Sequence, residues 1–371
     1  MRLILQPLAL LCGLVWLVGC GSTGTSSGSG SPVVSPASAQ IGGPSGAFSG
    51  SAAQQAMFDR LVYGEGFDRG ELERLFARVE RQPWIIELMD RQVRPAPPGP
   101  TGVWTRYRAR FVTPDNISNG TAFWRRHATT LERAYQRYGV PPEYIVAIIG
   151  VETRYGGYLG NTRIIDALAT LAFDYPRRAD YFTRELEAFL IMARDEGFDP
   201  LTPRGSYAGA MGLGQFMPSS FHGYAVDFDG DGHRDLWNPV DAIGSVANYL
   251  KGHGWRRGEP VVVRARATGY APRSQPVGFN TGYSLDRLRG MGIVPTGPVA
   301  GQREVSLLEL DIGTGYEYWL GFGNFYVITR YNHSTHYAMA VHQLAQALRD
   351  AQEAAGRRVS QRFDEASVER G

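Results

Sequence analysis

An acidic residue, Glu152, follows an apolar stretch of the chain. Glu152 follows three isoleucines at helical spacing, in a segment, 141–157, that begins with two prolines and ends with two glycines. Proline suits the first turn of a helix and glycine its end, so we predict a helix over 141–155 with Glu152 on its buried face. Burial favours the protonated carboxyl, which could deliver its proton to a leaving oxygen. An ion pair with Arg154, or rotation of the side chain to solvent, is equally compatible with the spacing.

A glycine-rich segment, 205–218, carries polar and aromatic side chains. Ser206 and Gln215 offer hydrogen bonds, and Phe216 offers a ring for stacking. Repeated glycine lets a ligand or another backbone come close, so this segment could line a sugar groove. Tight helix packing or a plain loop are the alternatives. A phosphate loop is excluded, because no Gly-Lys-Ser/Thr follows.

Segment 227–238 matches the start of an EF-hand calcium loop. Aspartates stand at positions one, three and five and glycine at position six, as the motif requires. Position twelve is Asn238 instead of glutamate, so either Asp235 or Asp241 would have to close the site. Asn238-Pro239 is also typical of a helix start, which places Asp241 in a first turn. A surface turn without metal is the alternative.

A fourth segment, 330–337, is predicted to lie between a strand and the last helix. Tyr331 and Asn332 suit sugar recognition by stacking and hydrogen bonding. His333 and His336 could suggest a metal, but no second group with ligand spacing completes a site. A catalytic triad is likewise unsupported, since no Gly-x-Ser-x-Gly elbow appears outside the Gly/Ser-rich tether.

The elements around these segments are mainly helical. Periodic apolar patterns predict helices between 52 and 138, most clearly over 123–138, and then at 164–173, 179–196, 239–251 and from 335 into the 350s. Pro95 to Pro100 is predicted to be a loop. Between 259 and 330 the sequence changes to short strand-like runs, such as 260–263 and 325–328, separated by glycine and proline. These patterns predict a mainly α (α+β) fold with a small β-rich part.

The N-terminus predicts export and a lipid anchor. Arg2 precedes an apolar stretch, 3–18, that is too short for a stable membrane span and ends at Cys20 in what looks like a lipobox. An ordinary secretory signal peptide is the alternative. The Gly, Ser, Ala and Pro composition of 21–51 predicts a flexible tether. With Cys12 removed in the signal peptide, no disulfide can form in the mature chain.

Bulk composition narrows the class of protein. The chain has 371 residues, 43% of them hydrophobic, which is enough for a large core. Its 38 basic and 36 acidic residues leave a net charge of +2 with no run of like charge. Nucleic acid is therefore not an expected partner.

Taken together, these motifs resemble the membrane-bound lytic murein transglycosylase B family over about 57–351. The resemblance rests on GVET at 150–153 with YG at 155–156, on GLGQFMPSS at 212–220, on the Asp/Gly loop with LWNPVDAIGSVANY at 236–249, and on YN at 331–332. It implies a lysozyme-like fold. The expected parts are a signal peptide (1–20), a tether (21–51), a helical domain (52–140 with part of 164–200), a catalytic core (141–258), a small β domain (259–329), a return to the core (330–357) and a polar tail (358–371).

The resemblance also assigns roles to individual residues. It implies that Glu152 is the catalytic acid and that the Asp/Gly loop holds structural Ca²⁺, with no organic cofactor. The implied groove residues are Ser206, Gln215, Phe216, Tyr249, Tyr331, Asn332 and Tyr337, and, on a weaker match, Tyr107, Arg177 and Arg178. The implied calcium ligands are the side chains of Asp227, Asp229, Asp231 and Asp241 and the carbonyl of His233.

The activity implied by the resemblance is cleavage of the MurNAc-GlcNAc bond of peptidoglycan with formation of 1,6-anhydro ends. Glu152 would act first as acid and then as base, and the sequence shows no second acid in a comparably buried helical setting. A lysozyme-type muramidase and a non-catalytic peptidoglycan-binding lipoprotein are the alternatives. The expected partners are glycan strands, the membrane through Cys20, and cell-wall synthesis or remodelling machinery. Gly21 after the anchor implies the periplasmic face of the outer membrane.

Overall fold

A computed structural model describes residues 46–91, 101–268, 275–299, 301 and 304–368, with side chains as far as Arg357. Helices occupy α1 (Ala52–Glu65), α2 (Arg69–Phe76), α3 (Pro83–Arg91), α4 (Val103–Arg108), α5 (Pro114–Arg126), α6 (Ala128–Tyr138), α7 (Pro142–Thr153), α8 (Ile164–Asp174), α9 (Ala179–Asp195), α10 (Pro218–Tyr224), α11 (Pro239–Gly252), α12 (Leu285–Gly290), α13 (Gly323–Tyr331) and α14 (Thr335–Val368), with a 3-10 turn at Pro176–Arg178.

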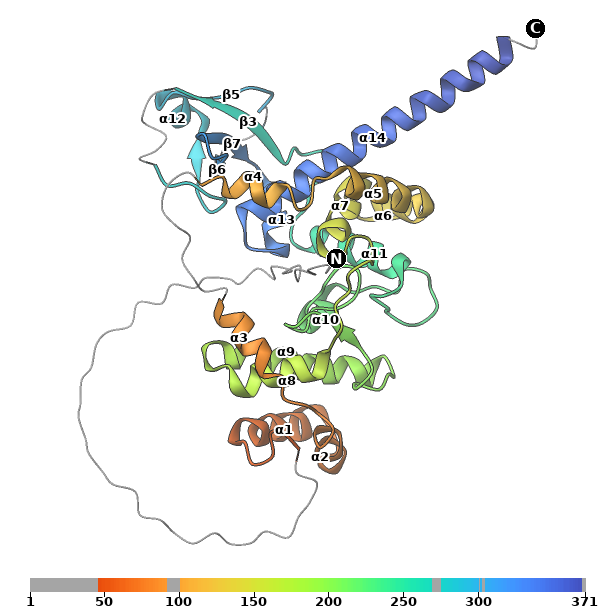
Figure 1. Ribbon diagram of the computed structural model, residues 1–371, viewed down its shortest axis with the longest axis vertical. Helices are drawn as coiled ribbons and strands as arrows, with labels where there is room; N and C mark the ends of the chain where they lie inside the picture. The colour runs from red at the N-terminus through yellow and green to blue at the C-terminus, as the bar shows by residue number, and fades with distance from the viewer. Residues whose placement is uncertain (1–45, 92–100, 269–274, 300, 302–303, 369–371) are drawn as a thin grey trace, which may run out of the picture.

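The helices form two groups that meet at α10 (Figure 1). In the first group, α8 and α9 pack together, and α1 and α3 lie against them. In the second, α7 is surrounded by α5, α6, α11 and α14. Helix α7 is apolar all round, and every residue from Glu143 to Thr153 except Glu152 is buried. A helix with no polar face can lie only at the centre of a core.

Five antiparallel strands form a separate layer beside α4 and α13 (Figure 1). Their order is β4 (Tyr283–Ser284), β6 (Glu304–Asp311), β7 (Tyr316–Gly321), β3 (Val262–Ala267) and β5 (Ile293–Pro295). The hairpin of β6 and β7 sets the register, with Leu308 opposite Trp319. This sheet has its own small apolar core, whereas Leu308 and Leu310 belong to the main one. A second, two-stranded ribbon pairs β1 (Thr162–Arg163) with β2 (Arg204–Gly205).

Three sequence-based predictions of secondary structure are wrong. Residues 325–328 are not a strand but the centre of α13, because Asn324 bonds to the backbone of Arg256 and Glu259 and turns Phe325 and Ile328 onto the main core. β-Branched and aromatic residues follow such packing more than intrinsic preference. The pattern over 123–138 spans two helices that break at His127, whose backbone is not helical (φ −112°, ψ 24°). Finally, α14 does not stop near Arg357 but continues to Val368 and projects from the body (Figure 1).

The expected signal peptide, Cys20, most of the tether and the Pro95 to Pro100 loop lie outside the described residues. Within the described ranges, no helix combines the length and apolar character needed to cross a membrane.

Candidate active site

Glu152 lies in the last turn of α7, where the chain leaves the core. Thr153 anchors this end of the helix, because its hydroxyl donates to the carbonyl oxygens of Ile149 (3.1 Å) and Leu213 (3.0 Å) and accepts from the N–H of Gly156 (3.1 Å). The bond to Leu213 joins α7 to the glycine-rich segment. The GVET motif therefore supplies an acid and, beside it, the residue that ties the acid's helix to the facing loop.

The glycine of the same motif makes room for a tyrosine. A Cβ on Gly150 would lie 2.4 Å from the Tyr155 hydroxyl, and one on Gly120 of α5 would lie 2.3 Å from it. Tyr155 has a left-handed backbone (φ 63°), and its hydroxyl donates to the carbonyl of Asn116 (3.0 Å). Tyr155 therefore folds back between α5 and α7 and fixes the turn that follows Glu152.

The carboxyl of Glu152 has one described hydrogen-bond partner, Tyr337 near the start of α14. The Tyr337 hydroxyl donates to Oε1 at 2.6 Å. Burial raises the pKa of Glu152 to about 7, and the bond from Tyr337 opposes that rise. The negative charge of Glu152 also contributes to raising the pKa of Tyr337, Tyr331 and Tyr107, each of which is raised mainly by burial. Burial therefore favours the protonated carboxyl near neutral pH, which suits a proton donor.

Tyrosines from α11 and α13 form an aromatic wall next to the acid. The hydroxyl of Tyr331 donates to the carbonyl of Gly214 (2.5 Å), and that of Tyr249 donates to the carbonyl of Arg330 (2.6 Å). Phe216 packs beneath both rings, with centroids 5.5 Å from Tyr249 and 5.9 Å from Tyr331. Buried hydroxyls bonded to backbone hold the rings in place, so the wall is rigid before any ligand arrives.

A cleft of about 250 Å³ opens over Glu152. Six predicted site residues line it: Glu152, Arg178, Gln215, Tyr249, Tyr331 and Asn332. Gln215 has a left-handed backbone (φ 51°), a strained conformation for a non-glycine residue. Its amide nitrogen donates to the carbonyls of Gly212 and Leu159, but its buried Oε1 has no partner. A buried acceptor without a donor is costly, so this oxygen is suited to a ligand's N–H or O–H group.

The remaining predicted residues lie behind the cleft or beside it. Phe216 supports its wall, and Tyr337 bonds to Glu152, as described above. Ser206 is buried, and its hydroxyl oxygen accepts from the N–H groups of Ala208 (3.3 Å) and Ala210 (2.9 Å). Arg177 lies 3.6 Å from Asp90. Tyr107 of α4 lies against Phe111 and His336.

One alternative and one expectation about acids are wrong. Arg154 does not pair with Glu152, because its guanidinium lies over the ring of Tyr158, 5.2 Å from the centroid. A second acid is buried in a helix and lines the cleft: Glu185 of α9. Its two oxygens accept from Ser219, from the N–H at 2.9 Å and from the hydroxyl at 2.8 Å. The periodicity of α9 could have revealed it, since Glu185 lies on the apolar helix face that also carries Phe182.

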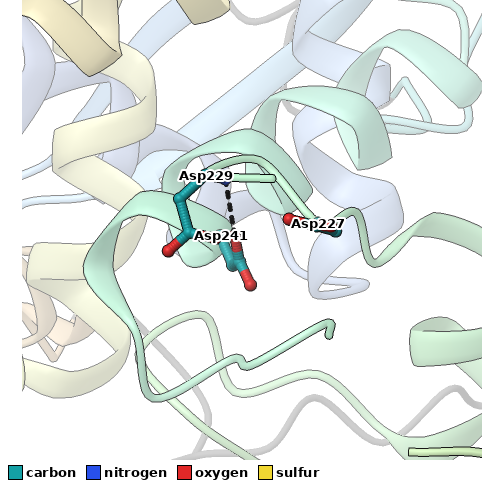
Figure 2. Close-up of side chains that lie close together, drawn as sticks. All are labelled: Asp227, Asp229 and Asp241. Carbon is teal, nitrogen blue, oxygen red and sulfur yellow. Dashed lines mark hydrogen bonds between the residues drawn. The ribbon is translucent and has the colours of Figure 1, made fainter. Parts of the chain in front are cut away.

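The Asp/Gly loop brings three carboxylates together. Oxygens of Asp227, Asp229 and Asp241 lie within 4.8 Å of one another. Figure 2 shows the three side chains converging, with the bond from the N–H of Asp229 to Asp241. Asp241 also accepts from the N–H groups of Phe228 (2.7 Å) and Asp235 (2.8 Å), so it organises the loop. Of the two residues that could close the site, it is Asp241 that joins this cluster.

The rest of the loop supports this arrangement. Asn238 caps α11, as its sequence position suggests, with its oxygen 2.9 Å from the N–H of Val240. Asp231 is not part of the three-carboxylate cluster, and its Oδ1 accepts from the N–H of His233 (2.9 Å). Burial raises the pKa of Asp241, an electrostatic cost that a bound cation would offset. Clustered carboxylate oxygens are the donors that Ca²⁺ prefers.

Comparison with known proteins identifies relatives over most of the chain. Residues 50–346 match the model of the transglycosylase SLT domain family. The chain is 56% identical over 314 residues to the membrane-bound lytic murein transglycosylase B of Escherichia coli (strain K12), covering 83% of this chain and 85% of the relative.

Solved structures of lytic transglycosylases are also similar to this chain. One is the Escherichia coli lytic transglycosylase Slt35 in complex with calcium, with a TM-score of 0.78 and 56% identity over 83% of this chain and 96% of that one. Another is SltB3 from Pseudomonas aeruginosa in complex with NAG-anhNAM-pentapeptide, with a TM-score of 0.70 and 33% identity over 81% and 80% of the two chains.

Proposed function

This chain belongs to the transglycosylase SLT domain family and is a peptidoglycan lytic transglycosylase, a lyase. We propose that Glu152 alone acts as both the general acid and the general base of the reaction. The observation that carries this proposal is the position of Glu152: a carboxyl with a pKa of about 7 at the floor of the cleft, bonded to Tyr337. The proposed product is a glycan strand that ends in 1,6-anhydro-MurNAc.

In the first step, Glu152 protonates the oxygen that joins MurNAc to GlcNAc. Tyr337 occupies Oε1, which leaves Oε2 as the oxygen that carries the proton toward the substrate. As the C1–O bond breaks, positive charge develops at C1, and the substrate's own acetamido oxygen stabilises it. The unpartnered Oε1 of Gln215 is suited to hold a donor group of the sugar during this step.

In the second step, Glu152 is ionised and takes the proton of the C6 hydroxyl of MurNAc. The C6 oxygen then bonds to C1 and closes the anhydro ring, so Glu152 is protonated again and no water is consumed. This scheme needs one carboxyl with a pKa near the working pH, unlike the two-carboxylate schemes of most glycosidases. The complex of the SltB3 relative with NAG-anhNAM-pentapeptide supports this type of product.

Glu185 bears on the hydrolase alternative, since it is a second carboxylate in the cleft. A general base must be free to accept a proton from water, but both oxygens of Glu185 are engaged by Ser219. Glu185 is better suited to hold the start of α10, which forms part of the cleft wall. This geometry favours the transglycosylase over a muramidase.

Digestion of purified sacculi tests the product. We expect mass spectrometry of the released muropeptides to find anhydro ends, each lighter by one water than a reducing end. Hydrated reducing ends as the main product would refute the proposed mechanism and support the muramidase. A wild-type protein that binds sacculi without releasing muropeptides would instead support the non-catalytic alternative.

We also propose that the Asp/Gly loop binds Ca²⁺ through Asp227, Asp229, Asp231 and Asp241 and the His233 carbonyl. A relative with 56% identity has been solved in complex with calcium. Calcium at 100 times its dissociation constant would add about 2.7 kcal/mol to the free energy of unfolding. We therefore expect millimolar calcium to raise the melting temperature by several degrees.

Two substitutions in the same loop sharpen the calcium test. Asp227→Asn should abolish the calcium-dependent rise, because it removes a charge from the cluster. Asp235→Asn should keep it, because Asp235 is not among the proposed ligands and its Oδ1 accepts from the N–H of Trp237. A rise that survives Asp227→Asn but not Asp235→Asn would show that the ligands are assigned incorrectly.

The proposed location is the periplasmic face of the outer membrane, with the lipid anchor on Cys20. The predicted tether of 21–51 is too long at its C-terminal end, because Phe48 is buried in the main core against Phe173. A curated relative is named membrane-bound. We expect the wild type to fractionate with membranes and Cys20→Ala to fractionate with soluble periplasmic proteins. Membrane association that is unchanged in Cys20→Ala would exclude this anchor.

A further inference from the structure

A carboxylate of the sheet holds the start of helix α4. The oxygens of Asp311, the last residue of β6, accept from the backbone N–H groups of Thr101 (2.7 Å), Gly102 (2.9 Å) and Val103 (3.3 Å). Partial desolvation raises the pKa of Asp311, but the N–H groups of Gly313 and of these three residues outweigh it and bring the pKa to about 2. Asp311 is therefore ionised at every pH at which the enzyme would work.

Helix α4 depends on such an external partner. It has six residues, and an isolated helix of that length is not stable in water. Its N-cap residue is Gly102, which has no side chain to bond the free N–H groups of the first turn. Asp311, more than 200 positions away in the sequence, accepts from two of those groups, on Gly102 and Val103, and from the N–H of Thr101 just before them, and it places a negative charge at the positive end of the helix.

Helix α4 also packs against the start of α14. Trp104 stacks on His336 (centroids 5.9 Å apart, 21° between planes), and Tyr107 contacts the same imidazole (5.7 Å). The residue after His336 is Tyr337, which donates to Glu152. The charge of Glu152 contributes to raising the pKa of Tyr107, after burial, so the Tyr107 hydroxyl is within electrostatic reach of the carboxyl.

We propose that Asp311 is a positioning residue for catalysis: by fixing α4 from the sheet, it holds Trp104 and Tyr107 against His336, the residue next to Tyr337. This inference rests on the proposed role of Glu152. The titratable groups that face the Glu152 carboxyl are the three tyrosines of α4, α13 and α14, namely Tyr107, Tyr331 and Tyr337. Releasing α4 removes one of these three and admits water to the carboxyl, which favours its ionised form.

The test compares two substitutions on β6. Asp311→Ala removes the contact with α4, whereas Glu309→Gln changes an acid two positions earlier that accepts from the Tyr318 hydroxyl within the sheet. The pKa of Glu152 is measured by carbon NMR titration, and kcat and KM by release of muropeptides. We expect Asp311→Ala to lower the Glu152 pKa by about one unit and kcat by roughly tenfold, with a smaller change in KM. Glu309→Gln should leave the Glu152 pKa unchanged.

A double-mutant cycle separates positioning from general loss of stability. In a Tyr107→Leu background, Asp311→Ala should have little further effect on the pKa or on kcat, because both act through the same contact. An unchanged Glu152 pKa in folded Asp311→Ala, or full additivity of the two substitutions, would overturn the proposal. If Asp311→Ala does not fold, Asp311→Asn keeps one acceptor oxygen and should give a smaller shift of the same sign; no shift would again overturn it.

The Glu152→Gln variant distinguishes failure of the proposed function from failure of the positioning role. A fully active Glu152→Gln would refute the role of Glu152 itself. An inactive Glu152→Gln, together with a Glu152 pKa that is insensitive to Asp311→Ala, would refute only the positioning role.

Discussion

Glu152→Gln is expected to lower the rate of muropeptide release by about 10³-fold or more, since general acid–base catalysis contributes typically 10²–10⁴-fold and this residue serves both steps. Glutamine keeps the shape of the side chain and can still accept from Tyr337, so the cleft should remain intact. The measurements are the initial rate on sacculi and the binding of sacculi in a pull-down, which should be unchanged.

The matched control for this substitution is Glu143→Gln. Glu143 is also an acid of α7, and burial raises its pKa too, but it lies at the other end of the helix, where Arg349 is 3.7 Å away. It is not part of the cleft. We expect Glu143→Gln to keep at least half of the wild-type rate. Similar losses in both variants would mean that a buried acid in α7 matters for folding and not for chemistry.

The rate should also fall as the pH rises through about 7. The first step needs protonated Glu152, whose pKa is about 7, so the donor is lost on the alkaline side. Tyr337→Phe removes a bond that favours the ionised carboxyl, so the pKa of Glu152 should rise. A hydrogen bond to a charged group contributes about 1.5–3 kcal/mol, so we expect the alkaline limb of the pH–rate profile to move up by roughly one unit.

Tyr331→Phe is the control for this shift. Tyr331 faces the same carboxyl, but its hydroxyl donates to the carbonyl of Gly214 and not to Glu152. Loss of the Tyr331 hydroxyl can lower the rate because it loosens the wall of the cleft. The alkaline limb of the pH–rate profile should stay near pH 7. An alkaline limb that moves down in Tyr337→Phe, or moves equally in both variants, would contradict the assigned hydrogen bond.

Local residue spacing was sufficient to predict the position of Glu152. Two prolines, an apolar run and two glycines predicted α7, and its periodicity placed Glu152 on a buried face. The same reasoning applied to α9 would have found Glu185, which was missed because that helix carries no recognisable motif. Spacing could not decide what either acid does, since that depends on partners far away in the sequence, Tyr337 for one and Ser219 for the other.

Tertiary contacts explain most of the remaining differences between the predicted and the observed structure. Residues 325–328 have strand-like composition, yet Asn324 and the main core hold them in α13. The periodicity of 123–138 continues across His127, so the break between α5 and α6 leaves no mark in the apolar pattern. The link from Asp311 to α4 crosses 208 to 210 positions, and no local signal could have indicated it.

Digestion of sacculi in water enriched in heavy oxygen tests most directly whether Glu152 is the catalytic acid and whether the C6 hydroxyl of MurNAc is the nucleophile. If the C6 hydroxyl of MurNAc attacks C1, the released muropeptides should carry anhydro ends with no heavy oxygen, and Glu152→Gln should release almost none. Reducing ends that carry one heavy oxygen each would show that water is the nucleophile, and would contradict the single-carboxyl mechanism.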